Sequence, residues 1–183
     1  MKINEFVDNL LSEDKEIVKE TTLKIMDEGD LNIVPALFDI LKNQELNHTT
    51  EAAVATILAS IKDPKFTPLL KDAILANYNN PEMQAKLVRV CWESTMNYAE
   101  LIPILCNLAI EGDFIVAMEA TTAIEEQLKN ADHDLIHDIH KELLNSDHQN
   151  SPFAEEVLAL IEQAIETMHN EQEEADEEFD GIE

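Results

Sequence analysis

Three histidines in the last third of the chain have the spacing of a metal site on one helix. The stretch DHDLIHDIHKE places His133, His137 and His140 at positions i, i+4 and i+7, and residues with this spacing share one face of an α-helix. Neutral imidazole binds zinc, copper and nickel, but a structural zinc needs four ligands. Asp134 and Asp138 fall elsewhere around the same helix, so they do not complete the set. We therefore expect a polar, partly exposed helix edge and no metal.

A second candidate pair, Glu166 and His169, has the Glu-x-x-His spacing of four-helix di-iron proteins. Such a site needs two of these motifs and two further glutamates from facing helices, and we find no second copy in a helix expected to face this one. The chain has no glycine-rich phosphate loop, no Gly-x-Ser-x-Gly elbow and no Cys-x-x-Cys pair. The sequence therefore contains no motif that predicts nucleotide binding, esterase activity or a zinc finger. We expect no catalytic residue, no cofactor and no enzymatic activity.

The net charge restricts the kind of partner. The 183 residues contain 12 Lys and Arg but 39 Asp and Glu, which gives a formal charge of −27. A field of this sign repels phosphate backbones and anionic membrane surfaces. We expect no nucleic acid and no membrane as partners, and instead a protein partner that is basic or of mixed charge.

The cysteines and the first residues bear on the compartment. Cys91 and Cys106 lie in apolar helical segments, where a free thiol behaves as a small hydrophobic group, so we expect reduced thiols in a cytoplasmic protein. The opening MKINEFVDNLLSED is acidic where a secretion signal needs a basic start, and no apolar run reaches the ~20 residues that span a bilayer. We expect a cytoplasmic location.

Proline-led apolar segments recur along the chain. Pro35, Pro68 and Pro103 each open one, at intervals of 33 and 35 residues, and a fourth segment has His137 in the proline slot. Each period contains two helical patterns joined by a short loop. A helix hairpin that repeats at this period buries its apolar face on its neighbours.

This periodicity predicts an all-α fold. We expect an α-solenoid of about four to five antiparallel helix pairs that forms one domain over residues 1–170. The remaining segment 171–183, EQEEADEEFDGIE, carries eight acidic residues and no basic one. It has too little apolar surface to offset chain entropy, so we expect a disordered acidic tail.

The segment SIKDPKFTPLLKDAIL resembles the HEAT repeats related to phycobilin lyases. The match is best over residues 50–77, where Asp63 and Pro64 precede Pro68 and an apolar helix, although Lys62 replaces the usual glycine. The resemblance implies a curved scaffold whose second helices line a concave, partner-binding face. It also raises an alternative function, a phycobilin-lyase-like or other small-molecule-handling factor on the same scaffold.

One position in each repeat lies on the side of the second helix away from its apolar stripe. The four positions, each four residues after the proline slot, are Asp39, Asp72, Asn107 and Lys141. In the resembled repeats this side lines the concave groove, so the four residues are the predicted partner contacts; the alternative is a solvated polar face. The expected function is a non-enzymatic protein–protein interaction scaffold, monomeric or weakly dimeric, with the acidic tail as the competing interaction site.

Overall fold

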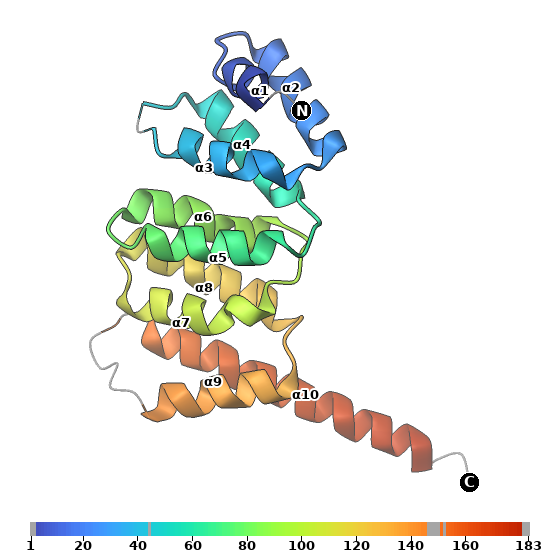
Figure 1. Cartoon of the computed structure of the whole chain (residues 1–183). Helices are drawn as coiled ribbons and strands as arrows, with labels where there is room; N and C mark the ends of the chain where they lie inside the picture. Colours follow the sequence, from blue (N-terminus) through green and yellow to red (C-terminus); the bar gives the residue numbers. More distant parts are fainter. Residues whose placement is uncertain (1–2, 44, 146–150, 152, 181–183) are drawn as a thin grey trace. The chain divides into compact units, whose positions relative to one another are not determined.

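The computed structural model describes residues 3–43, 45–145, 151 and 153–180, with side chains described as far as residue 170 (Figure 1). This part of the chain consists of ten α-helices and two short 3-10 helices and contains no strand. The all-α prediction is therefore confirmed. The chain divides into two compact units, Met1–Met96 and Asn97–Glu183, where we expected one domain over residues 1–170. In repeated hairpins most contacts join near neighbours, which favours such a division.

Unit 1 contains six α-helices. They are α1 (Ile3–Leu10), α2 (Lys15–Glu28), α3 (Val34–Leu41), which follows the 3-10 helix η1 (Leu31–Ile33), α4 (His48–Ser60), α5 (Phe66–Ala76) and α6 (Pro81–Glu93). The first helix of each hairpin packs on the next, α2 on α4 and α4 on α6, while α3 packs on α4 and α5 on α6.

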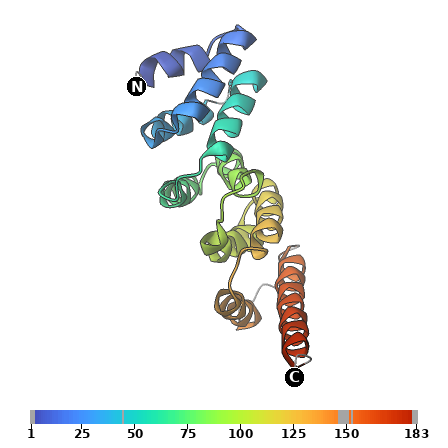
Figure 2. The ribbon, with the colours of Figure 1, turned by 90° about the vertical axis from the view of Figure 1, so that its right-hand side faces the viewer.

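Unit 2 contains four α-helices. They are α7 (Ile102–Glu111), which follows the 3-10 helix η2 (Ala99–Leu101), α8 (Phe114–Leu128), α9 (His133–Asn145) and α10 (Ala154–Asp180). Helix α7 packs closely on α8, and α10 contacts α7, α8 and α9. Figure 2 shows α10, in red, next to α9.

The first helices of the hairpins begin at a cap that recurs every 33 residues. The N-cap residues of α2, α4, α6 and α8 are Asp14, Asn47, Asn80 and Asp113. The first three accept a hydrogen bond from a backbone N–H of their own first turn, at 2.9, 3.0 and 3.2 Å. These bonds satisfy N–H groups that have no partner within the helix.

A second set of side chains fixes the turn before each second helix. Asp30, Asp63, Asn97 and Asp132 each accept a hydrogen bond from a backbone N–H two or three residues later, at 2.8–2.9 Å. The prolines follow these turns: Pro35 and Pro103 lie at the start of α3 and α7, where their missing N–H costs nothing.

The core repeats with the same period. On the first helices the equivalent positions Ile25, Leu58, Cys91 and Ile124 are at most 3% exposed, and so are Leu37, Leu70, Leu105 and Ile139 on the second helices. The repeat inferred from the prolines thus corresponds to matched buried positions within each unit.

Two further expectations concern the C-terminal segment and membranes. Residues 171–180 continue α10 as helix, where we expected disorder from 171 onward; Glu, Gln and Ala are good helix formers, which accounts for the extension. Residues 181–183 lie outside the described residues. No helix in the described part of the chain is long and apolar enough to cross a membrane.

Candidate partner-binding site

The four predicted contact residues are all exposed. Asp39 and Asp72 lie on α3 and α5 of unit 1, and Asn107 and Lys141 lie on α7 and α9 of unit 2. Each sits on the solvent side of its second helix, opposite the buried leucine or isoleucine of that hairpin. The structure therefore brings the acidic pair into one compact unit and the other two residues into the other.

The two acidic residues differ in their surroundings. Asp39 accepts a hydrogen bond from Lys42 Nζ at 2.8 Å, and both side chains are more than half exposed. An exposed pair of this kind contributes about 0.2–1 kcal/mol, so Lys42 can exchange Asp39 for another partner at little cost. Asp72 makes no ion pair among the residues that the structure describes, and its charge is available to a basic side chain.

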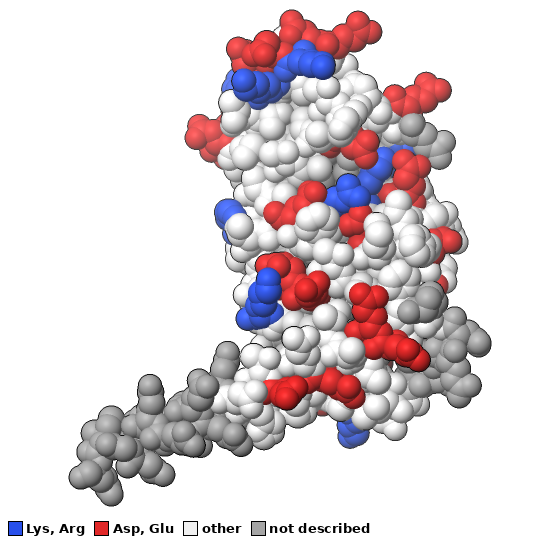
Figure 3. All heavy atoms as spheres, turned by 180° about the vertical axis from the view of Figure 1, so that it is seen from behind, with Lys and Arg blue, Asp and Glu red and all other residues white. Residues whose placement is uncertain are grey.

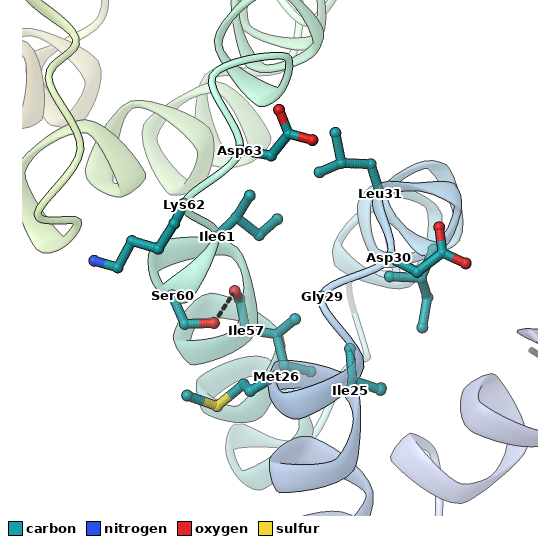
Figure 4. Close-up of a pocket in the computed structure, with 11 residues that line it drawn as sticks. Ile25, Met26, Gly29, Asp30, Leu31, Ile57, Ser60, Ile61, Lys62 and Asp63 are labelled. Carbon is teal, nitrogen blue, oxygen red and sulfur yellow. Dashed lines mark hydrogen bonds between the residues drawn. The ribbon is translucent and has the colours of Figure 1, made fainter.

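A cavity of about 190 Å³ opens at the turn edge of unit 1. It lies where α2 ends and η1 begins, next to the matching turn between α4 and α5 (Figure 4). Its lining is mostly aliphatic, with a few polar groups at the rim: Ile25, Met26, Gly29, Asp30, Leu31, Ile33, Ile57, Ser60, Ile61, Lys62 and Asp63.

The floor and the rim of this cavity have different character. Ile25, Ile33 and Ile57 are buried and form the floor. Leu31 and Ile61 are half-buried and face each other across the opening in Figure 4. Such a concave apolar surface with a few polar groups at its edge is typical of a binding pocket.

Gly29 makes the turn beside the cavity. Its φ of 61° is left-handed, and its N–H donates to the carbonyl of Ile25 at the end of α2. Glycine adopts this conformation without a Cβ penalty. A Cβ at Gly29 would meet nothing within 4 Å, so the glycine is needed for its backbone conformation and not for space.

Charged groups of both signs border the cavity. The side chain of Asp63 points toward Leu31, whereas the carboxylate of Asp30 lies on the outer side of its turn (Figure 4). One oxygen of each carboxylate accepts backbone N–H groups of its own turn. Lys62 points away from the cavity and donates to the hydroxyl of Thr95, which leaves Asp63 as the charged group at the opening.

Asp30 and Asp63 were not among the residues predicted to contact a partner. The 33-residue repeat could have indicated that these two residues border a site. The Gly29-Asp30 and Lys62-Asp63 turns are 33 residues apart, and hairpins that pack side by side bring equivalent turns together. An apolar residue on each side of a repeated turn, Leu31 and Ile61, was the second signal.

On the face shown in Figure 3, acidic side chains are spread over the helices and basic ones are few. Lys86 Nζ lies 3.1 Å from Glu51 and 3.0 Å from Glu82. Burial lowers the pKa of Lys86, but the hydrogen bonds to the two glutamates outweigh it and raise that pKa above its ordinary value.

The two cysteines are buried, and neither is part of a disulfide. Burial raises the pKa of Cys91 to about 12, and burial together with the nearby Glu142 carboxylate raises that of Cys106 to about 12. The thiolate is the nucleophile and the metal ligand. These thiols therefore serve as core residues and not as reactive groups.

The three histidines of α9 do not form one cluster. The rings of His133 and His137 lie 4.8 Å apart, whereas His140 Nε2 lies 3.5 Å from Glu162 Oε1 of α10. His169 of α10 lies with its ring 6.4 Å from that of His133. Within the described residues no three His, Cys, Asp or Glu side chains are already arranged to hold a metal ion.

No protein-family model matches the chain, and neither does any curated protein or solved structure. The resemblance to HEAT repeats therefore stays a prediction based on residues 50–77. The features of the molecule that bear on its function are the cavity, the exposed acidic residues and the fold.

Proposed function

We propose that the protein is a non-enzymatic interaction scaffold that binds a protein segment of basic or mixed charge. The observation that carries this proposal is the apolar cavity at the turn edge of unit 1, with Asp63 at its opening. A cavity of about 150 Å³ accommodates benzene, so this one suits a single leucine or phenylalanine side chain. A neighbouring lysine or arginine of the partner would meet Asp63.

The second part of the proposed surface is the exposed acidic pair, Asp39 and Asp72, on the second helices of the same unit. With a net charge of −27, the molecule attracts a basic segment over a distance of about one Debye length, which speeds encounter more than it increases affinity. Lys62 and Lys65 flank Asp63 in the sequence, and this mixture of signs favours a partner that carries both.

We further propose that the hairpins form an α-solenoid of the HEAT type. The caps at 33-residue intervals, the matched buried positions, and the packing of α2 on α4 and of α4 on α6 within unit 1 support this arrangement. In a solenoid each hairpin contacts only its neighbours, and the exposed faces of the second helices provide an extended surface for a peptide.

The test is affinity capture from the native cell, followed by titration calorimetry with the captured partner. Asp63→Asn removes the charge at the opening but preserves the cap, because asparagine caps as well as aspartate does. Asp132→Asn is the matched control: it makes the same change at the equivalent turn of unit 2. We expect the first variant to weaken binding and the second to leave it unchanged.

Two outcomes would contradict the proposal. If the Asp63→Asn variant and the Asp39→Lys, Asp72→Lys double variant both bind normally while deletion of residues 171–183 abolishes binding, the tail is the interaction site. If the purified protein carries a chromophore or metabolite, seen as visible absorbance or by mass spectrometry, the alternative of a phycobilin-lyase-like or other small-molecule-handling factor is favoured.

A further inference from the structure

Three imidazoles from two helices converge in unit 2. His133 and His137 lie one turn apart on α9, with ring centroids at 4.8 Å and an interplanar angle of 41°. His169 comes from α10, and its ring lies 6.4 Å from that of His133 at 71°. Helices α9 and α10 pack against each other. The cluster therefore bridges two elements.

The register of the two helices is antiparallel. His133 faces His169, and His140 lies 3.5 Å from Glu162. Residue numbers therefore rise by seven along α9 while those of the facing residues on α10 fall by seven. Glu162, Glu166 and His169 are at i, i+4 and i+7 on α10, a spacing that places them on one face. That face runs along the histidine edge of α9 and places Glu166 one turn from His169.

One nitrogen of this cluster lacks a partner. His133 Nε2 is buried and has no hydrogen-bond partner among the described residues. A buried polar atom without a partner is uncommon and costs about 1–3 kcal/mol. His137 and His169 are exposed, so their rings are free to turn toward this nitrogen.

The measured ring separations are close to those that a shared metal ion would require, but do not match them. With a Zn–N bond of about 2.1 Å, the centroids of two imidazoles on one zinc lie about 5–6 Å apart, and the two measured separations, 4.8 and 6.4 Å, lie just outside this interval on either side. A shared ion therefore requires the exposed side chains of His137 and His169 to change rotamer, and staggered rotamers are available to both.

We propose that His133, His137 and His169 bind a divalent late transition-metal ion of the class of Zn²⁺ or Cu²⁺, with Glu166 as the carboxylate ligand. Imidazole is a preferred ligand of both ions, and three nitrogens with one carboxylate complete a four-coordinate set. The sequence alone pointed to a trio on one helix. The structure replaces His140 with His169 and supplies the fourth ligand that the α9 trio lacks.

The site is tested by calorimetric titration of Zn²⁺ into the tag-free full-length chain after treatment with a chelator. We expect about one equivalent to bind, and His169→Asn to weaken binding by at least about tenfold, since even an outer-shell change costs 10–100-fold. His140→Asn is the matched control, because His140 lies on the same edge of α9 but does not belong to the proposed ligand set. The affinity of this variant for Zn²⁺ should stay within about twofold of that of the original chain, well below the tenfold effect of a lost ligand. His48→Asn in unit 1 controls for adventitious histidine binding.

Binding should also raise the melting temperature of the original chain, because a ligand that binds only the folded state stabilises it. His137→Asn, at an exposed position, gives a second variant that should lose this shift. The proposal is overturned if Zn²⁺ shows no saturable binding, if His169→Asn and His137→Asn bind as the original chain does, or if His140→Asn loses as much affinity as His169→Asn.

Discussion

At the scale of single residues, the buried leucines at equivalent positions of the hairpins carry much of the stability. Leu70 and Leu105 are fully buried on the inner side of α5 and α7. Truncation of either to alanine removes apolar contacts and leaves a cavity, so we expect a loss of about 2–5 kcal/mol in the free energy of unfolding.

Urea denaturation followed by circular dichroism measures this loss. Lys42→Ala is the comparison, because Lys42 is about half exposed and its ion pair among the described residues is with the exposed Asp39. The cost of this change should stay below about 0.5 kcal/mol. Equal costs for the buried and the exposed change would show that these leucines do not form the core.

The cysteines give a second prediction at this scale. Because the pKa of Cys91 and of Cys106 is raised to about 12, both thiols remain protonated at pH 8, and the thiolate fraction grows only as the pH approaches 12. Alkylation by iodoacetamide at pH 8 should therefore be slow in the native protein and fast in denaturant, with mass spectrometry as the readout. Rapid labelling of the folded chain would contradict the burial of these thiols.

At the scale of the helix, the caps fix where each hairpin begins. Asn47 accepts the backbone N–H of Thr50 at 3.0 Å at the start of α4. Asn47→Ala removes this bond and should cost about 0.5–2 kcal/mol. Asn47→Asp keeps the cap and adds a favourable interaction with the helix dipole, so its stability should equal or exceed that of the original chain. Chemical denaturation distinguishes the two, and an equal loss in both variants would show that the cap bond is unimportant.

Most of the helices could be predicted from the sequence, and the features that were not predicted have physical explanations. The prolines gave the period because proline is tolerated in the first turn of a helix. The caps at Asp14 and Asn47 escaped notice because an Asx residue also occurs in ordinary turns. The helix over residues 171–180 was missed because acidic composition was weighed above the helix propensity of glutamate.

The candidate sites were harder to predict than the helices. The position of His169 beside His133 depends on the register of α9 and α10, which no local spacing determines. The cavity beside Asp63 depends likewise on two turns that are 33 residues apart. Residues that share a helix face could be predicted; residues that meet across two helices could not.

At the scale of the whole molecule, the charge of −27 governs association. Partner binding should be fast at low salt and weaken as ionic strength rises from about 0.1 M to 1 M, where the Debye length falls from about 10 Å to about 3 Å. Reversal of Asp39 and Asp72 to lysine should reduce the association rate and flatten the salt dependence without loss of helix. Stopped-flow kinetics across a salt series measures both, and a rate independent of salt would exclude electrostatic steering.

The 33-residue spacing of the helix caps has a consequence for how the chain can change length. Removal of residues 47–79, which span one full period, would join Leu46 to Asn80 and substitute one asparagine cap for another. Helix α6 would then take the place of α4 against α2, since both present buried residues at the same positions. Removal of one more residue would eliminate the cap and leave Pro81 at the junction. Shortened or lengthened versions of this protein should therefore differ by whole multiples of the period, with every junction at an Asx residue.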